Sequence, residues 1–264
     1  MKLFDNKTLL VVLLLLSSYG YIASCKHENE LPPPAASNTP TITRGTAVLT
    51  PGNMTAGNRT EWKFDKTHSS ALWSTSYMAA AGLLTGRFNQ FGIHDVTDAE
   101  MINYPGTGQP LKDSSWAFYE SDPSKTYFNG YVQINQSNTG EPGRDIGCNV
   151  AGMGTTAIIP ATQNLSVTNL AKIKTTKVEY DALSADYIVT LNLTWQGKLA
   201  SPASKTIVGK LKYVPRGTVT LPTSSYDVFG LQLKFQFNCR DFGMTSTSIA
   251  DKIDVECNMN FNNK

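Results

Sequence analysis

The chain has few of the side chains from which catalytic and metal centres are usually built. Its 264 residues include three histidines, His27, His68 and His94, and four cysteines. Neither an H-x-x-x-H nor a C-x-x-C spacing occurs, so the sequence offers no ordinary set of zinc ligands. The nucleophile motif G-x-S-x-G and the Walker phosphate loop are also missing. We therefore expect no enzyme activity, no catalytic residues, no metal ion and no catalytic cofactor.

Charge is sparse as well. Charged residues make up 17% of the chain, below the usual quarter, and the net charge is only +2 at pH 7. Acidic and basic residues are interleaved, whereas a nucleic-acid-binding domain carries a basic stripe. Serine, threonine, asparagine and glycine are abundant, as is typical of secreted β proteins with many turns. We expect no nucleic-acid partner.

No apolar run is long enough to cross a membrane as a helix. The longest aliphatic run, 9–16, has eight residues, and a membrane-spanning helix needs about 20. Lys2 and Lys7 precede this run and small neutral residues follow it, which is the layout of a cleaved secretory signal. Residues 22–25, Ile-Ala-Ser-Cys, resemble the bacterial lipobox. We expect a lipoprotein signal peptide at 1–24 and lipidation of Cys25; the alternative is an ordinary signal peptide with a chance cysteine.

A proline-rich segment follows the cysteine. Residues 25–59 carry Pro32, Pro33, Pro34, Pro40 and Pro51 among small polar residues, with almost no periodic apolar content. Such a segment cannot bury enough surface to offset its conformational entropy, so it is predicted to be a disordered tether. Acyl chains on Cys25 would anchor the protein stably without a membrane-spanning helix. We expect a lipid-anchored protein of the bacterial cell envelope, on the periplasmic face or the outer surface.

The predicted domain, 60–262, is a succession of strands. Apolar and polar residues alternate at 187–195, 231–237 and 253–261, which places one face of each strand on an apolar interior and the other in water. Weaker strand patterns lie at 62–64, 71–77, 127–134, 167–180 and 207–214. The best helix candidate, 76–84, is short and interrupted by Gly82. The segment 92–125 is predicted to be a long loop or irregular excursion that packs Trp116 and Phe118.

These patterns predict an all-β fold. An antiparallel sheet of about eight strands must pair its edges or close on itself, and closure into a barrel is the simpler solution. Cys239 and Cys257 lie in the apolar phases of the last two strands, so a hairpin about residue 248 would bring them face to face. A cross-strand disulfide and two reduced, buried thiols remain equally open. Cys148, in a glycine-rich loop, is a free thiol or a competing partner.

Two motifs carry a resemblance to a known family. Asp65-x-x-His68-Ser69 is followed by Trp73 and by Gly-Arg-Phe at 86–88, and residues 238–244 read Asn-Cys-Arg-Asp-Phe-Gly-Met. These motifs resemble the opening and the late N-R-x-D-F-G-L signature of the YceI-like family, lipocalin-like bacterial lipid-binding proteins, with Cys239 where an arginine is usual. Residues 144–145 are similar to the family's R-D-x-H, although Gly147 replaces the histidine. The leader adds the lipoprotein form of the family.

The resemblance implies an eight-stranded lipocalin-like barrel whose apolar channel holds or transfers a polyisoprenoid, such as an isoprenoid quinone or a polyprenyl lipid. A barrel of this size is either filled by side chains or holds one slim ligand. His68 is a candidate for the ligand head group, although a structural hydrogen bond in its turn explains it equally well. The alternative function is a structural or adhesive envelope barrel with a packed interior. The candidate channel residues are Trp62, Phe64, His68, Trp73, Tyr77, Phe88, Tyr187, Val189, Leu191, Leu193, Trp195, Leu231, Leu233, Phe235, Phe237, Val255 and Met259.

Overall fold

The computed structural model describes residues 45–51, 62–77, 82–93, 115–141, 145 and 170–264. All of them belong to one compact unit, Ile42–Lys264. Cys25, the predicted signal, most of the predicted tether, His94 and Cys148 lie outside the described residues, so those predictions stay predictions. Residues 45–51 of the tether are described, and there the predicted disorder is wrong: Val48–Leu49 form a strand that pairs with Phe118 and Tyr119, and Leu49 is buried. Of the described part of the chain, no helix is long and apolar enough to span a membrane.

Strands dominate the described residues, with short 3₁₀ turns between some of them. In chain order the elements are β1 (Val48–Leu49), β2 (Lys63–Phe64), η1 (Lys66–His68), β3 (Ser70–Tyr77), β4 (Gly82–Phe88), β5 (Phe91–Gly92), β6 (Trp116–Tyr119), η2 (Pro123–Lys125), β7 (Tyr127–Gln133), η3 (Ile134–Gln136), β8 (Ser137–Asn138), β9 (Leu170–Asp181), β10 (Asp186–Trp195), β11 (Ala203–Thr220), β12 (Ser225–Asn238), η7 (Cys239–Phe242) and β13 (Lys252–Asn262).

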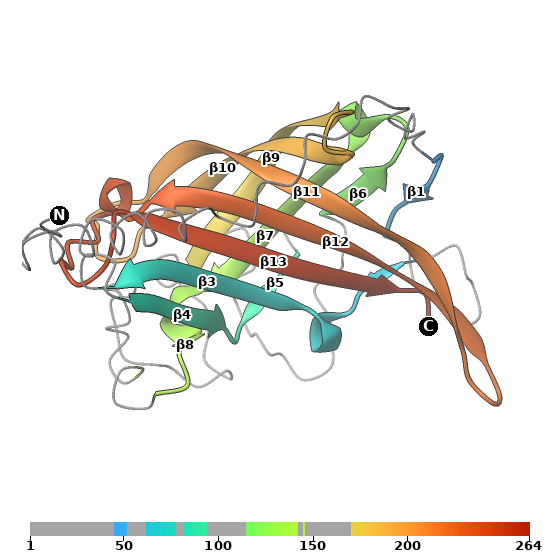
Figure 1. The fold of residues 1–264 in the computed structure, drawn as a ribbon, viewed down its shortest axis with the longest axis horizontal. Coiled ribbons are helices and arrows are strands. Elements are labelled where there is room, and N and C mark those ends of the chain that lie inside the picture. The colour runs from blue at the N-terminus through green and yellow to red at the C-terminus, as the bar shows by residue number, and fades with distance from the viewer. Residues whose placement is uncertain (1–44, 52–61, 78–81, 94–114, 142–144, 146–169) are drawn as a thin grey trace, which may run out of the picture. The chain divides into compact units, whose positions relative to one another are not determined.

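The strands pair into one antiparallel sheet, and the predicted all-β, antiparallel class is confirmed. Within the described ranges the sheet has thirteen strands, in the order β1-β6-β7-β9-β10-β11-β12-β13-β3-β4-β8, with β2 paired to β13 and β5 to β7. The prediction of eight strands is therefore wrong for the whole sheet. In Figure 1, β11, β12, β13 and β3 run across the front, and β7 and β9 pass behind them.

The path of paired strands is open, with β1 and β8 at its ends, but the chain that follows β4 links that strand to β7. β4 pairs with β8 through Phe88 and Ser137, and β5 pairs with β7 through Phe91 and Val132. Between these pairs, the backbone N–H of Asn89 donates to the carbonyl of Gln136 at 2.9 Å. Chain continuity thus leads from β4 through β5 back to β7. The long strands surround a common interior, and we call this curled sheet the barrel.

The strong alternations of the sequence become the inner and outer faces of the long strands. In β10, every second residue from Tyr187 to Trp195 is buried. β12 and β13 pair over eleven residues, from Val228 opposite Asn262 to Asn238 opposite Lys252. Side chains of opposite phase stand on opposite faces of a pleated strand, so one apolar phase per strand builds the interior.

One sequence prediction fails in the connections and one is confirmed. The rejected helix candidate at 76–84 contains the end of β3 and the start of β4, where Tyr77 pairs with Gly82 across the two strands. The segment predicted to be irregular contains β6, whose Trp116 and Phe118 are buried as expected. The β6 strand pairs with β7 and β1, so a regular strand anchors this part of the chain.

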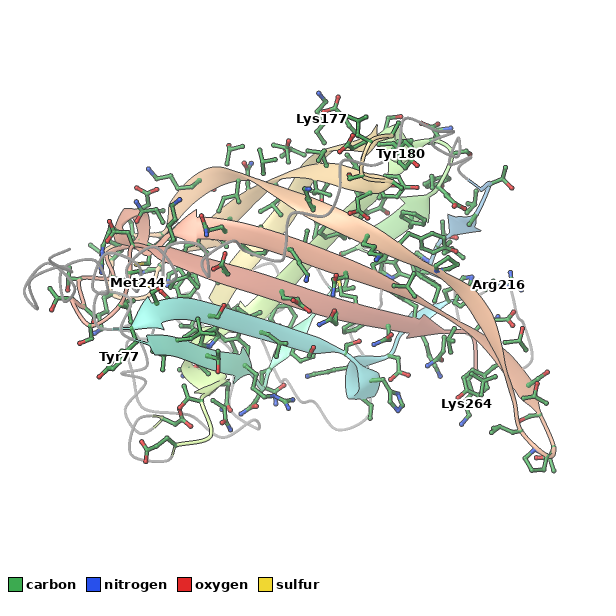
Figure 2. The ribbon with its side chains drawn as sticks, in the orientation of Figure 1. Tyr77, Lys177, Tyr180, Arg216, Met244 and Lys264 are labelled. Carbon is green, nitrogen blue, oxygen red and sulfur yellow. The ribbon has the colours of Figure 1, made fainter. Side chains whose placement is uncertain are left out.

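β11 and β12 extend beyond the end of β13 as a two-stranded ribbon (Figure 1). The base of this ribbon is held by Asp227, which is only 3% exposed. Its carboxylate accepts hydrogen bonds from Arg216 at 2.5 Å and Thr218 at 2.7 Å. These bonds, of which that from Thr218 is the largest cause, keep the pKa of Asp227 below its ordinary value. Arg216 and Lys264 mark this end of the barrel, and Tyr77 and Met244 mark the opposite end (Figure 2).

Candidate functional site

The interior of the barrel has two unlike regions. The first, at the end near Arg216, is a cluster of aromatic rings that we call the filled half. Phe229 stacks on Phe261 with ring centroids 4.5 Å apart and an interplanar angle of 4°. Trp62 meets Phe229 edge to face at 4.8 Å, and Trp116 lies 4.4 Å from Phe261. Such ring pairs add to the burial of their apolar area, so this region is packed solid.

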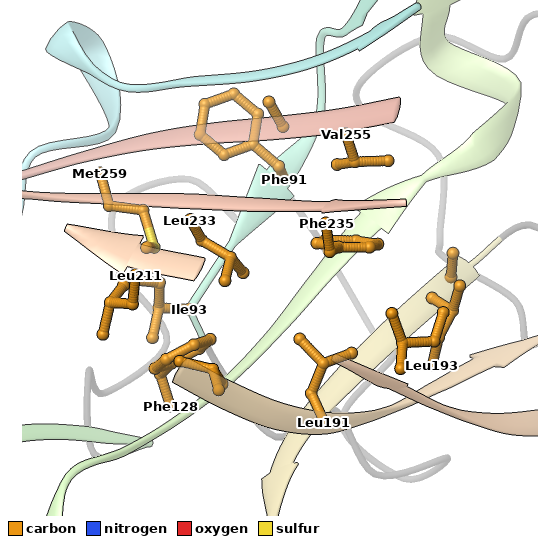
Figure 3. Packing of buried hydrophobic residues seen from close by; sticks show 14 of the residues in the cluster. Phe91, Ile93, Phe128, Leu191, Leu193, Leu211, Leu233, Phe235, Val255 and Met259 are labelled. Atoms are coloured by element: carbon orange, nitrogen blue, oxygen red, sulfur yellow. The ribbon is translucent and has the colours of Figure 1, made fainter. Parts of the chain in front are cut away.

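The second region contains a cavity, and we call it the cavity half. About 60 Å³ of it is open to the centre of a water-sized sphere. Figure 3 shows Phe91, Phe128, Phe235 and Val255 among the buried side chains of this interior, with Phe235 and Val255 on neighbouring strands. The lining residues are Phe64, Ser70, Ala71, Trp73, Phe88, Phe91, Gly92, Ile93, Phe128, Asn129, Gly130, Tyr131, Val132, Ala171, Ile173, Leu193, Trp195, Phe235, Phe237, Ile253, Val255, Cys257 and Met259.

The cavity is elongated along β13. Ile253, Val255, Cys257 and Met259 occupy four successive inward positions of that strand and all line the space. Successive residues in a strand advance by about 3.3 Å, so the lined stretch is about 20 Å long. The described lining contains no charged side chain. A narrow apolar space of this shape suits one slim hydrocarbon chain.

Nine of the predicted channel residues line this cavity and eight do not. Those that do are Phe64, Trp73, Phe88, Leu193, Trp195, Phe235, Phe237, Val255 and Met259. Val189, Leu191, Leu231 and Leu233 are buried in the interior without lining the cavity, and Trp62 and Tyr187 belong to the filled half. Tyr77 is 44% exposed at the end of β3, so it lies outside the cavity.

His68 is also outside the cavity, because its side chain is 75% exposed. Its ring Nδ1 lies 2.7 Å from Asp65 Oδ2, and its backbone N–H donates to the same carboxylate. Asn262 donates to Asp65 at 2.9 Å, and Asn260 donates through its side-chain amide to the carbonyl of His68. The D-x-x-H-S motif therefore fastens the turn before β3 to β13, and these contacts agree with the structural interpretation of His68.

The electrostatics of that turn agree with a structural role. Burial alone would raise the pKa of the Asp65 carboxyl, but the hydrogen bonds from His68 and Asn262 outweigh it and hold the pKa below its ordinary value. The late motif is structural as well. Arg240 donates to the carbonyls of Met244, Ser246 and Ile249, which folds the β12–β13 connection over one end of the barrel.

Trp73 closes one wall of the cavity half. Its indole Nε1 donates to Ser137 Oγ at 2.9 Å, a bond between β3 and β8 that is fully buried. The ring lies over Gly86 of β4, where an added Cβ would come within 2.5 Å of two ring carbons. Glycine is therefore required at 86 for the ring to cover the strand, which explains the glycine of the G-R-F motif.

Lys66 stands beside this cavity. Its ammonium donates to Gln90 Oε1 at 2.8 Å and lies 5.7 Å from the ring centroid of Phe91, one of the lining residues. Burial lowers the pKa of Lys66 from 10.5 to about 8. Apolar surroundings disfavour the charged form of an amine, so the shift is a measure of how dry this position is.

Of the two alternatives that the sequence left open for Cys239 and Cys257, the structure has the free thiols and not the disulfide. The hairpin forms, but its register places Cys257 opposite Leu233, while the backbone N–H of Cys239 bonds to Asp251. Leu233 and Cys239 are six residues, or about 20 Å, apart along the strand, and a disulfide needs Cα atoms within about 7 Å. Burial raises the pKa of both thiols, that of Cys257 to about 12.

Sequence reasoning missed much of the wall opposite β12 and β13. Ile93 falls in the segment 92–125 predicted to be irregular and Phe91 lies directly before it, and Gly130 and Ala171 are too small to signal an interior role. Ile253 and Cys257, by contrast, share the alternating phase of Val255 and Met259, so phase alone identifies them. No group of three His, Cys, Asp or Glu side chains in the described ranges could hold a metal ion.

The curled antiparallel sheet and its apolar interior space define a lipocalin-like β-barrel. Residues 62–261 match the family model of the YceI-like domain, and the chain belongs to that family. No curated protein matches the chain.

Several solved structures resemble the chain at low identity. BcnA of Burkholderia cenocepacia is 12% identical, covering 75% of this chain and 99% of its own, with a TM-score of 0.47. A polyisoprenoid binding domain from Saccharophagus degradans is also 12% identical, covering 76% and 97%, with a TM-score of 0.38. The YceI protein of Campylobacter jejuni is 15% identical, covering 69% and 85%, with a TM-score of 0.39.

Proposed function

We propose that the barrel binds one slim, long apolar molecule of the polyisoprenoid class, an isoprenoid quinone or a polyprenyl lipid, in its cavity half, without covalent chemistry. The observation that carries the proposal is the elongated cavity, lined along β13 by four successive inward side chains and free of charged groups among the described residues. A polyisoprenoid is the ligand that the family resemblance implies, and the S. degradans domain is described as binding one. Dry apolar walls favour a hydrocarbon because its transfer from water releases about 0.8 kcal/mol per CH₂.

The size of the cavity sets a condition on this function. A cavity of about 150 Å³ is known to admit benzene, and the space here is about 60 Å³. A long chain therefore enters only if lining side chains rotate away from their positions in this structure. The glycines and small residues of the β5, β7 and β9 wall leave room for such movement, whereas the stacked rings of the filled half do not.

The same small volume favours a second candidate function, a structural or adhesive barrel with no ligand. In that case the gap is a packing defect between large rings and small neighbours. The two functions differ in one measurable property, which is whether the folded protein takes up a hydrocarbon chain.

The deciding experiment is extraction of the full chain purified from its own membranes, followed by mass spectrometry, together with uptake of ubiquinone-2 by the extracted protein. Ala171→Leu adds volume to the lining and is expected to reduce uptake at least tenfold. Val208→Leu, on the 63% exposed outer face of β11, is the matched control and should bind normally. A wild-type protein that is empty and takes up nothing would establish the packed barrel instead.

We further propose that a lipidated Cys25 tethers the domain to a membrane of the bacterial cell envelope, from which it holds or transfers its ligand. This proposal is supported by the lipobox-like residues 22–25 and the proline-rich segment after them. Labelling of cells with a radioactive fatty acid is expected to mark the wild-type protein and not Cys25→Ser. Equal labelling of the two would contradict it.

A further inference from the structure

One polar atom of the cavity half has no hydrogen-bond partner. Trp195, the last residue of β10, lines the cavity and is 2% exposed, yet its indole N–H meets no acceptor. Buried donors almost always find an acceptor, because an unmade hydrogen bond leaves the group desolvated without compensation. The unpaired indole N–H of Trp195 in the cavity wall therefore needs a physical explanation.

Among the described residues, those that surround Trp195 supply no acceptor side chain. In the sheet it stands opposite Ala171 of β9 and Ala203 of β11. Its ring packs against Phe237 at 5.7 Å and Phe242 at 6.2 Å between centroids. These neighbours are apolar, and Phe242 belongs to η7, which covers this end of the barrel. Since no described residue supplies an acceptor for the indole N–H, a molecule in the cavity is in a position to supply one.

The other tryptophans show that this arrangement is particular to Trp195. Trp73 lines the same cavity, but its indole N–H is already bonded to Ser137. Trp116 also has an unpartnered indole N–H, but it lies in the filled half, against the rings of Phe229 and Phe261, and does not line the cavity. Trp195 thus combines an unused donor with access to the cavity.

We propose that Trp195 is a specificity-determining residue that donates a hydrogen bond to a neutral oxygen of the ligand, a carbonyl, hydroxyl or ether, at the end of the cavity covered by η7. This inference rests on the proposed binding function. A pure hydrocarbon would leave the indole N–H unsatisfied. A carboxylate at this end would bury a charge among uncharged lining residues, because Lys66, the amine beside the cavity, lies next to Phe91 at the other end of β13. A fatty acid with its carboxylate at Trp195 is therefore disfavoured.

A competition experiment on the full chain tests this selectivity. Phosphatidylcholine vesicles carrying equal amounts of hexadecane, 2-hexadecanone and hexadecanoate are equilibrated with the protein, and the three species bound to it are measured by gas chromatography. The ratio of bound ketone to bound hydrocarbon is expected to fall roughly threefold to tenfold in Trp195→Phe relative to wild type, the value of one net hydrogen bond. Partitioning into the vesicles cancels in this comparison. Trp116→Phe, which removes the unpartnered N–H of the filled half, should keep the wild-type ratio.

A second measurement needs no stable variant. The chain has four tryptophans, so protein labelled with ¹⁵N-tryptophan gives up to four indole N–H resonances. The Trp195 resonance should move downfield when 2-hexadecanone binds and not when hexadecane binds, while that of Trp73 serves as an internal reference for a bonded indole.

The results of these two experiments distinguish a failure of the proposed Trp195 role from a failure of the proposed binding function. If hexadecane and 2-hexadecanone bind and shift Trp195 alike, or hexadecanoate binds best, the role of Trp195 is refuted and apolar binding stands. If none of the three binds, the proposed function and the role of Trp195 fall together.

Discussion

Phe229 and Phe235 lie six residues apart on the same strand and meet different surroundings. Phe229 stacks on Phe261 and meets Trp62 edge to face, whereas Phe235 borders an open space. The strands opposite account for the contrast. In the filled half β6 contributes Trp116 and Phe118, whereas the wall facing Phe235 includes Gly92, Gly130 and Ala171. Large rings facing small residues leave a gap that large rings facing large rings do not.

A single sheet can thus enclose a tightly packed interior at one end and an interior with empty space at the other. Interlocked rings have few alternative rotamers, so the filled half stabilises the fold. Rings that border a void can rotate into it at lower cost, so the cavity half is the place for a ligand. The predictions below, from the largest effect to the smallest, test that division.

The largest effect is expected from removing one ring in each half. Phe261→Ala deletes a fully buried ring that contacts Phe229, Trp116 and Phe64, and should lower the free energy of unfolding by about 3–5 kcal/mol. Phe235→Ala, whose ring borders existing space, should cost clearly less and increase uptake of ubiquinone-2. Denaturant unfolding of the two variants measures the difference. Equal losses of stability would show that the halves are packed alike.

A smaller effect is expected where Trp73 covers β4. Gly86→Ala places a methyl group within 2.5 Å of the Trp73 ring, so the ring must shift and stability should fall by about 1–3 kcal/mol. Gly82→Ala on the same strand is the matched control, because an added Cβ there meets nothing within 4 Å. Thermal unfolding measures the stability of both variants. If Gly86→Ala were as stable as Gly82→Ala, the Trp73 ring would move aside at no cost, and the wall there would not be tightly packed.

The smallest effect concerns Lys66 beside Phe91. Its pKa in the folded protein is about 8, below the ordinary 10.5, so between these values the unfolded chain binds more protons than the folded one. The contribution of this group to stability should therefore rise as the pH increases from 8 toward 10. Unfolding measured at pH 7.5, 8.5 and 9.5 should show this rise in the wild type and a flatter profile in Lys66→Met. If the stability of the two proteins depended on pH in the same way, the Lys66 ammonium would be solvated by water rather than held in the dry cavity half.

The sequence predicted the long strands well, because their apolar phase is a local property. The alternations at 187–195, 231–237 and 253–261 appear as β10, β12 and β13 with the expected inward faces. Family membership follows from the two motifs at the ends of the domain, and the matched range is 62–261. The polar motif residues Asp65, His68 and Arg240 fasten turns, whereas Trp73 and Phe88 of the first motif line the cavity.

Other features depend on which strands face each other, and no local pattern contains that information. The cysteines share the right phase, but the register of β12 on β13 separates them. Tyr187 and Leu193 share one inward phase of β10, yet only Leu193 lines the cavity, because Tyr187 meets Phe118. Periodicity indicates which side chains of a strand point inward, but not the size of the side chains that face them from other strands.

The sequence by itself determined an antiparallel β protein with an apolar interior, since a period of two can be satisfied only by strands with one buried face. Only the tertiary structure decided that the interior is solid at one end and hollow at the other, because volume depends on side chains brought together from strands distant in the chain. It also showed that the buried indole N–H of Trp195 has no acceptor among the described residues, because this depends on every strand that packs around the ring.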